Sequence, residues 1–144
     1  MDAVIQMLDK TNSNKVSARD YSPLVLAYIG DGIYEVFIRD YIIKKGNAPV
    51  NKLHKAVRDF VRAQAQATVY HAIFDSLTEE EVGVLKRGRN AKSVSVPKNA
   101  DVMTYRLATG VEALIGYLYL DEKLDRIAEL MSIGMENIEQ NNIK

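Results

Sequence analysis

Apolar residues recur at the spacing of α-helices along almost the whole chain, and no stretch shows the strict alternation of a β-strand. Ser22-Pro23 predicts a helix start, with Ser as the N-cap and Pro at the first helical position. The apolar run that follows, Leu24 to Lys45, is interrupted at Gly30-Asp31-Gly32 and closes at Gly46. Two glycines inside a helix cost about 1 kcal/mol each relative to alanine, so close packing of another helix or a ligand at Asp31 should compensate.

A second long pattern runs from Pro49 to Phe74 and predicts one continuous helix. At its centre, the stripe Ala63-Gln64-Ala65-Gln66-Ala67 indicates tight packing against a neighbouring helix. Thr78 and Glu81 then form a capping box at the head of a short helix that ends near Arg87.

The rest of the chain, from Gly88 onward, predicts a loop and two more helices. Gly88 to Lys98 is rich in Ser and Asn and contains Pro97, so we expect a loop there. Asn99 or Asp101 caps a helix that reaches about Leu120, and a last helix runs from about Glu122 to Asn137. The core stripe of the first of these helices is Val102, Leu107, Val111, Leu114 and Leu118.

These elements predict a single all-α domain over residues 21–137. We expect residues 1–20 to form a flexible N-terminal segment and residues 138–144 a polar C-terminal tail. The length of 144 residues and the hydrophobic content of 47% are ordinary for one globular domain. The chain has no cysteine, which excludes disulfides, Cys-based zinc sites and thiol nucleophiles. No uncharged apolar run is long enough to span a membrane, and the N-terminus lacks the apolar block of a signal peptide.

The formal net charge is zero, which by itself speaks against a nucleic-acid partner. The charges are unevenly distributed, however, because residues 39–106 carry thirteen basic and seven acidic residues between two acidic ends. The sharpest basic segment, Lys86 to Lys98, contains no acid at all. Such a cluster attracts phosphate groups, although charge alone slightly favours the alternative explanation, a solvated loop.

Most kinds of catalytic site have no support in this sequence. His54 and His71 lie on what is predicted to be one helix, about 25 Å apart at 1.5 Å per residue, too far to share a metal ion. Glycine-rich phosphate loops and dinucleotide fingerprints are absent, and Ser93 and Ser95 have no nearby histidine to activate them.

Asp31 and Glu112 are more informative, because each interrupts an otherwise apolar helix. A lone carboxylate is costly to bury unless it is paired or bound to a metal ion. Two carboxylates brought together would repel each other, and a hard cation such as Mg²⁺ would relieve that repulsion. The alternative is that each is paired with a base elsewhere or faces water. Glu35, one turn after Asp31, shares its helix face, whereas Asp101 lies roughly 16 Å from Glu112 along the helix and is expected to be a cap.

Two motifs resemble known signatures. Leu26-Ala27-Tyr28-Ile29-Gly30-Asp31-Gly32 resembles the Phe-Leu-Gly-Asp helix of the ribonuclease III catalytic domain, and Val111-Glu112-Ala113-Leu114-Ile115-Gly116 resembles its second signature. Leu85-Lys86-Arg87-Gly88-Arg89-Asn90-Ala91-Lys92-Ser93, followed by Val96-Pro97-Lys98-Asn99, is similar to the small subfamily called Mini-ribonuclease III. The likeness extends over about residues 20–130.

The resemblance implies the ribonuclease III helical fold and assigns Asp31 and Glu112 as catalytic carboxylates that bind Mg²⁺, with Mn²⁺ as a substitute. The full-length family has further acids at the positions of Leu24, Ala27 and Thr109, and Mini-ribonuclease III shares this reduction. Waters would then complete the coordination of the ion, and one of them could attack the phosphodiester. Thr109, one turn before Glu112, is a candidate for orienting such a water.

The resemblance also implies the substrate and the partners. It predicts a cytoplasmic, homodimeric bacterial endoribonuclease that cleaves double-stranded RNA, matures the stem of the 23S ribosomal RNA precursor, and works with ribosomal proteins or ribosomal particles. Full-length ribonuclease III carries a separate RNA-binding domain, so here the catalytic domain itself is expected to grip the RNA. The candidate contacts are Lys86, Arg87, Arg89, Lys92 and Lys98, together with a stripe at Lys52, Lys55, Arg58 and Arg62.

Two other functions remain open from the sequence. A helical RNA-binding module of the same fold would have lost the chemistry, as the residues Leu24, Ala27 and Thr109 suggest. A protein–protein adaptor would have no RNA partner, and its basic segment would be only a solvated loop.

Overall fold

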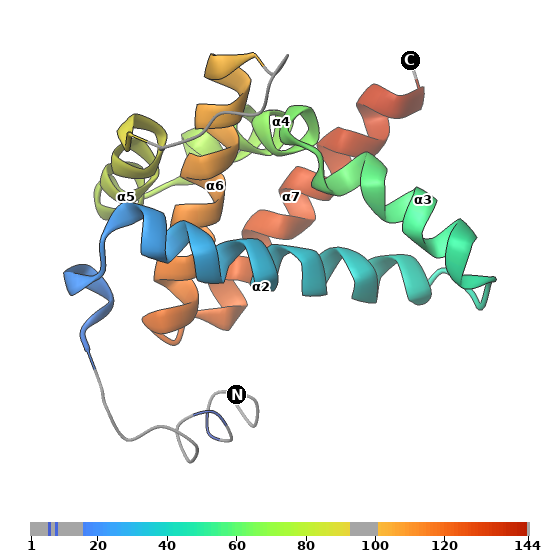
Figure 1. Ribbon diagram of the computed structural model, residues 1–144, viewed down its shortest axis with the longest axis horizontal. Helices are drawn as coiled ribbons and strands as arrows, with labels where there is room; N and C mark the ends of the chain where they lie inside the picture. The colour runs from blue at the N-terminus through green and yellow to red at the C-terminus, as the bar shows by residue number, and fades with distance from the viewer. Residues whose placement is uncertain (1–5, 7, 9–15, 93–100, 144) are drawn as a thin grey trace.

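The computed structural model describes Gln6, Leu8 and residues 16–92 and 101–143, and within these ranges the chain is helical with no strand (Figure 1). The predicted all-α class is therefore confirmed. No helix among the described residues has the length and the hydropathy that crossing a membrane requires. In chain order the elements are η1 (Ala18–Asp20), α2 (Pro23–Ile43), α3 (Val50–Val61), α4 (Ala63–Ile73), η2 (Phe74–Ser76), α5 (Glu79–Asn90), α6 (Val102–Leu120) and α7 (Leu124–Ile143).

Helix α6 is the centre of the fold. It packs against α2, α4, α5 and α7, and Figure 1 shows these helices arranged around it. Its side chains from Ala108 to Leu118 are buried, apart from the partly buried Glu112. Val102, which the sequence placed in the core stripe, is 47% exposed because it is the first residue of the helix. A central helix that is apolar all round needs neighbours on every side.

The backbones of α2 and α6 touch where the two helices cross. A Cβ atom at Gly30 would lie 1.7 Å from the carbonyl oxygen of Glu112, and one at Gly116 would lie 1.9 Å from the carbonyl oxygen of Leu26. Glycine at both positions is therefore what allows the crossing. By contrast, a Cβ at Gly32 would meet nothing within 4 Å. Close packing explains the first glycine of α2 and leaves the second unexplained.

The helix starts follow the predicted caps. The Ser22 side chain caps α2 with Pro23 in its first turn, Thr78 and Glu81 form the capping box of α5, and Asp101 caps α6. The predicted end of α5 is wrong, because the helix continues past Arg87 to Asn90. Gly88 packs there against α6, where an added Cβ would lie 2.6 Å from the Cβ of Ala113.

Two further boundaries differ from the sequence prediction. The helix predicted from Pro49 to Phe74 is two helices, because Arg62 has an extended backbone with ψ 157° that ends α3 and starts α4. The one-helix estimate of the distance between His54 and His71 therefore does not apply. The last helix begins at Leu124 and continues to Ile143, beyond the predicted end at Asn137, so residues placed in the polar tail are helical.

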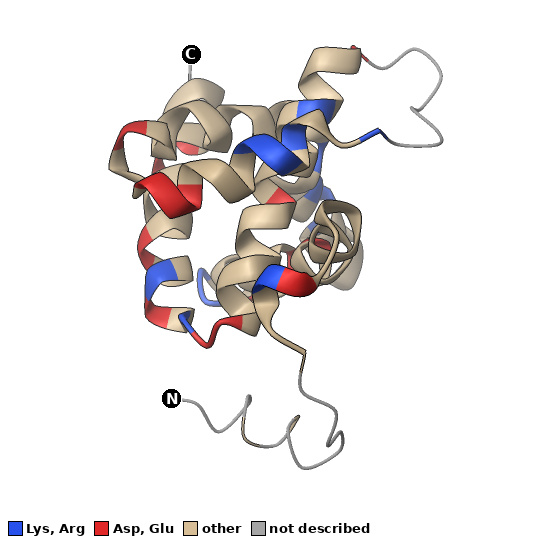
Figure 2. Cartoon of the chain, turned by 90° about the vertical axis from the view of Figure 1, so that its left-hand side faces the viewer, with Lys and Arg blue, Asp and Glu red and all other residues tan. Residues whose placement is uncertain are grey.

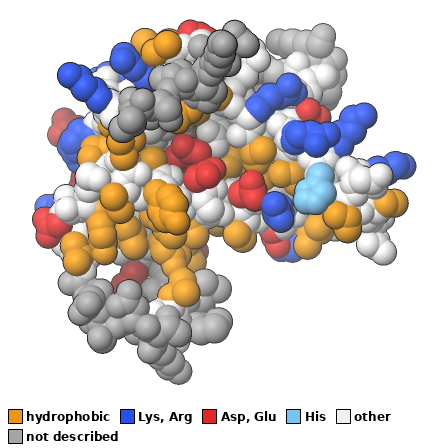
Figure 3. Space-filling view, in the orientation of Figure 1, with side chains coloured by type: hydrophobic (Ala, Val, Ile, Leu, Met, Phe, Trp, Pro, Cys, Tyr) orange, Lys and Arg blue, Asp and Glu red, His pale blue; other side chains and the backbone are white. Residues whose placement is uncertain are grey.

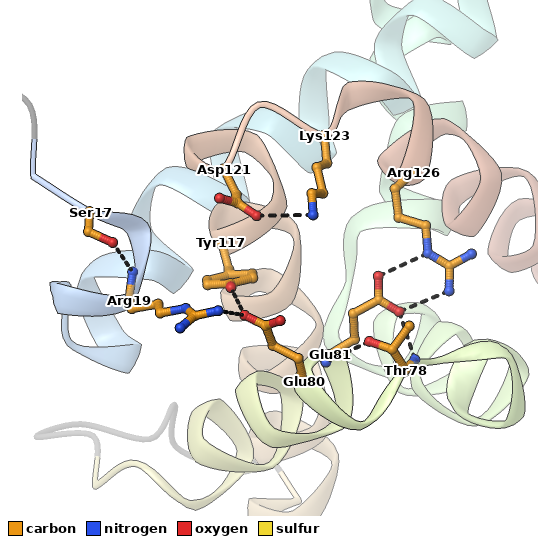
Figure 4. Close-up of polar contacts among 9 residues, drawn as sticks. All are labelled: Ser17, Arg19, Thr78, Glu80, Glu81, Tyr117, Asp121, Lys123 and Arg126. Carbon is orange, nitrogen blue, oxygen red and sulfur yellow. Dashed lines mark hydrogen bonds and ion pairs between the residues drawn. The ribbon is translucent and has the colours of Figure 1, made fainter.

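Polar contacts attach the short helix η1 to the helical core (Figure 4). Arg19 pairs with Glu80 at 2.9 Å, and the Tyr117 hydroxyl donates a hydrogen bond to the same carboxylate. Ala18, which the sequence assigned to the flexible segment, is buried. Beside this cluster, the buried Glu81 accepts two hydrogen bonds of 2.9 Å from Arg126, which ties the start of α5 to α7.

Candidate active site

The structure brings Asp31 of α2 and Glu112 of α6 together at the crossing of the two helices. Gly30 touches the backbone of Glu112, so the neighbouring Asp31 reaches the Glu112 carboxyl group, and the two carboxyl groups interact by hydrogen bonding. Burial first, and then the hydrogen bond and the negative charge of Asp31, raise the pKa of Glu112 from 4.5 to about 8. A hydrogen bond from Gln66 opposes this rise.

No ion pair between described residues involves either carboxylate. Within the described part of the chain, the alternative that each acid is paired with a base therefore has no support. The alternative that each acid faces water holds for Asp31, which is exposed, whereas Glu112 is only partly exposed. Once both carboxyl groups are deprotonated they repel each other, and no described base offsets their charge, so this pair of hard oxygen donors fits a divalent cation such as Mg²⁺. The described residues contain no group of three or more His, Asp or Glu that could hold a metal ion, so water would have to complete the coordination.

Gln66 is a site residue that the sequence interpretation missed. Its side chain is only 3% exposed, and its Nε2 lies 3.3 Å from Oε2 of Glu112. The sequence feature that could have indicated this residue was the presence of a polar side chain within the stripe of small residues on α4. Because the helix break at Arg62 resets the helical phase, the sequence alone did not show which glutamine of the stripe points inward.

Tyr34 also lies near the carboxylates. Its side chain is fully buried, and its hydroxyl donates to the carbonyl of Phe60 at 2.5 Å. Burial, and then the negative charge of Glu112, raise the pKa of Tyr34 above its ordinary value, so the phenol stays neutral. It therefore serves as a hydrogen-bond donor that joins α2 to the end of α3.

The other residues that the sequence placed near the site have separate partners. Glu35 pairs with Arg39 at 2.8 Å, and Asp101 caps α6. The buried Thr109 donates its hydroxyl to the carbonyl of Tyr105 one turn earlier.

The positions of the missing family acids on α2 are occupied by apolar side chains. Ala27, one turn before Asp31, is buried, whereas Leu24 is 38% exposed. The histidines are both exposed, and His71 packs edge-on against the ring of Tyr70.

Basic side chains lie on two sides of the molecule. Lys52, Lys55 and Arg58 are exposed on α3, and Arg62, at the break, pairs with Asp59 at 2.9 Å. Figure 3 shows one group of Lys and Arg over α3 and another at the upper left over the α5 side, with acidic side chains on the surface between them.

The second group comes mainly from the last turns of α5. Lys86 and Arg87 are exposed on this helix, and Lys92 is exposed just after it. Arg89 is only partly exposed, because it donates to the Tyr70 hydroxyl at 3.0 Å. Lys98 lies outside the described residues. In Figure 2, acidic positions follow the left edge of the molecule, with basic ones among them in its lower half, while a further group of basic positions lies in the upper half away from that edge.

The raised pKa of Glu112 predicts how stability depends on pH. Between about pH 4.5 and 8 the folded protein retains a proton that the unfolded chain has released. The free energy of unfolding should therefore fall as the pH rises through this interval, by at most about 1.4 kcal/mol per pH unit for the one proton. Urea unfolding in buffers that contain a chelator would measure this slope.

The matched control for that measurement is Glu112→Gln, which cannot titrate. The variant should lose this part of the pH dependence and should be more stable than the unchanged protein near pH 8. Equal slopes in the two proteins would show that the Glu112 carboxyl is not desolvated beside Asp31.

Three comparisons identify similar proteins. A family model described as the ribonuclease III domain matches residues 24–123. A Mini-ribonuclease 3 from Brevibacillus brevis is 51% identical over 118 residues, covering 82% of this chain and 88% of that protein. A Mini-ribonuclease 3 from Enterococcus faecalis is 47% identical over 131 residues, covering 88% and 99%. An X-ray crystal structure of a Fusobacterium nucleatum protein has a TM-score of 0.75 at 37% identity and covers 82% of this chain and 96% of that one.

Proposed function

The chain belongs to the ribonuclease III family and is an endoribonuclease of the Mini-ribonuclease III type, and we propose that it cleaves double-stranded RNA with the help of Mg²⁺. The observation that carries this proposal is the meeting of Asp31 and Glu112 at the α2–α6 crossing. Because both side chains are acidic, an RNA phosphate would be repelled by them unless a cation lay between.

Asp31 and Glu112 would hold the ion. When bound, Mg²⁺ lowers the pKa of water and offsets the negative charge that develops on the phosphodiester. The protein's own contribution is a rigid crossing that fixes both carboxylates, and a Glu112 carboxyl group that the surrounding helices remove from water. Mn²⁺ should replace Mg²⁺, because oxygen ligands suit both ions.

Thr109 is a candidate for orienting a water beside these carboxylates. It lies on α6 one turn before Glu112, and its hydroxyl proton already points to the Tyr105 carbonyl. The hydroxyl oxygen would therefore act toward a water as a hydrogen-bond acceptor.

RNA would be gripped by the two basic groups. A-form RNA is recognised largely through its phosphates and 2′-hydroxyls, so charges fixed on helices are sufficient contacts. We propose that the contacts come from Lys52, Lys55, Arg58 and Arg62 on one side and from Lys86, Arg87, Arg89, Lys92 and Lys98 on the other.

We also propose that the enzyme is a homodimer, in which each subunit cleaves one strand. The outer face of α2 supports this, because Leu24, Val25, Tyr28 and Val36 are exposed, Tyr28 by 83%. Figure 3 shows apolar side chains gathered over this part of the molecule. An apolar patch of this kind on a folded protein is typical of an interaction surface, and twofold pairing is the commonest assembly.

The biological substrate that we propose is the stem of the 23S ribosomal RNA precursor in the cytoplasm, presented free or with ribosomal proteins or ribosomal particles. This part rests on the resemblance to Mini-ribonuclease III, whose motifs at Asp31, Glu112 and Lys86–Asn99 this chain carries.

The direct test of the function uses the unchanged protein with a labelled precursor stem, an unrelated duplex and the single strands of each. Cleavage of the duplexes that requires Mg²⁺ or Mn²⁺ and stops with a chelator is the expected result. Binding without cleavage at every metal concentration would favour an RNA-binding module without chemistry. Absence of both binding and cleavage would favour the adaptor.

The basic residues predict how binding depends on salt. Changing Lys55, Arg58, Arg87 and Lys92 to alanine, singly and together, should weaken duplex binding and flatten the plot of log affinity against log salt. The slope should change by about one unit for each phosphate that the variant no longer neutralises. These four side chains are exposed, so the fold should be unaffected. Filter binding in chelator over a salt series measures the slope.

Lys123→Ala is the matched control, because Lys123 is an exposed base paired with Asp121 at the far end of α6. Its salt slope should equal that of the unchanged protein. Arg89 is left out of the set because its substitution would also break its hydrogen bond to Tyr70. An unchanged slope in the fourfold variant would place the RNA on another face.

A further inference from the structure

Three polar side chains are almost fully buried among the described residues, namely Gln66, Glu81 and Thr109, at 3%, 7% and 9% exposure. Glu81 caps its own helix and pairs with Arg126, and Thr109 donates to the backbone of its own helix. These contacts complete or join helices. Gln66 differs, because its side-chain amide donates to the carboxylate of Glu112.

The position of Gln66 is fixed by the same helix that carries Asp31. Tyr34, about one turn after Asp31, donates to the carbonyl of Phe60 at 2.5 Å and so fixes the end of α3 against α2. The chain then breaks at Arg62, and α4 starts with a hydrogen bond from the Gln66 N–H to the Arg62 carbonyl at 3.1 Å. Gln66 therefore reaches the Glu112 side chain from the first turn of α4, a different helix from the one that carries Asp31.

A neutral amide suits this place better than a charged donor. Lys or Arg beside Glu112 would form an ion pair and compete with a cation for the carboxylate. The amide of glutamine supplies hydrogen-bond donors without a charge. It can therefore restrain Oε2 of Glu112 without reducing the negative charge with which Asp31 and Glu112 attract a cation. A buried carboxylate also needs such a partner, since burial without a hydrogen bond is costly.

We propose that Gln66 is a positioning residue, which holds the Glu112 carboxylate toward Asp31 in the arrangement that receives the divalent cation. The inference rests on the proposed function, because it assigns the ion to Asp31 and Glu112. Removing a partner that orients a metal ligand typically changes metal affinity or activity by 10–100-fold.

The test is Gln66→Met, which keeps the length of the side chain and removes its amide. Mn²⁺ alone is titrated into the protein without RNA and followed by electron paramagnetic resonance. The Mg²⁺ concentration for half-maximal cleavage is then measured. Both the Mn²⁺ dissociation constant and this Mg²⁺ concentration should rise at least about tenfold, while duplex binding in chelator stays unchanged. A purely structural role would change the melting temperature and leave both metal readouts where they are.

Gln64→Met is the matched control, because Gln64 lies in the same turn of α4 with an exposed side chain, and it should leave both readouts unchanged. If Gln66→Met does not fold, Gln66→Asn keeps an amide that is one methylene too short to reach Glu112, and it should show the same loss. Suppose that the unchanged protein is active and that a folded Gln66 variant has the same Mn²⁺ dissociation constant and the same Mg²⁺ requirement. That result would overturn the role of Gln66 and leave the proposed function standing. An unchanged protein that binds no Mn²⁺ and cuts no duplex would overturn the proposed function itself.

Discussion

Changing Glu112 to Gln, or Asp31 to Asn, should lower the rate of duplex RNA cleavage at least about a thousandfold. Each change removes one of the two negative oxygen donors that the structure brings together at the α2–α6 crossing. Charge stabilisation by a bound ion contributes several kcal/mol to the transition state, and each 1.4 kcal/mol is a factor of about ten in rate. Single-turnover cleavage of a labelled duplex at saturating Mg²⁺ would measure the loss.

The loss should be confined to chemistry, because both substitutions preserve shape. Either variant also removes the repulsion between the two carboxylates, so it should unfold at the same or a higher urea concentration near pH 8. Duplex affinity in chelator should be retained, since the basic groups are untouched. Sedimentation velocity should still give the mass of a dimer, and Glu136→Gln, an exposed acid on α7, should cleave normally. Full activity in both site variants would remove Asp31 and Glu112 from the mechanism.

Much of this fold follows from local signals in the sequence. The caps at Ser22, Thr78 and Asp101 each satisfy backbone N–H groups that a helix start leaves open, and this requirement depends on only a few neighbouring residues. Glu112 was visible for a similar reason, because a charge inside an apolar helix needs a partner or a ligand. Asp31 also interrupts an apolar run, but it is exposed in the structure, so the cost of burial does not explain it. The catalytic role of the two acids stays a prediction that the cleavage assay will decide.

The misplaced boundaries depend on contacts between distant segments. Gly88 was predicted to begin a loop rich in Ser and Asn, yet it packs against Ala113 and Gly110 of α6 and the helix continues past it. The break between α3 and α4 at Arg62 could not be predicted from the sequence, because no Pro or Gly lies beside it. That break decided which residues of α4 face inward, so the partner of Glu112 could not be read from the spacing of the stripe.

The structure divides the charges more finely than the segments of the sequence did. The sequence showed a basic middle between acidic ends, but α5 itself is divided, with Glu79, Glu80 and Glu81 in its first turn and Arg87 and Arg89 in its last. This division favours the helix, since acids suit its N-terminus and bases its C-terminus. It also places the bases at the end of α5 from which the chain leads to α6, the helix that carries Glu112.

Gly30→Ala should destabilise the protein by more than about 3 kcal/mol, because the added methyl group would meet backbone and not a flexible side chain. Its Cβ would lie 1.7 Å from the Glu112 carbonyl oxygen and 2.8 Å from the Gly116 nitrogen. The two helices would have to separate along their contact, which also exposes buried neighbours. Urea unfolding would measure the loss, and cleavage should fail even where the variant stays folded, since Glu112 must move.

Gly32→Ala is the matched control, two residues along the same helix, where an added Cβ meets nothing within 4 Å. Alanine is the better helix former by about 1 kcal/mol, so this variant should be slightly more stable than the unchanged protein. Sedimentation velocity on both variants separates a change in folding from a change in the proposed pairing through the exposed face of α2. If Gly30→Ala and Gly32→Ala unfolded at the same urea concentration, α2 and α6 would not be in backbone contact. The position of Asp31 beside Glu112 would then need another explanation.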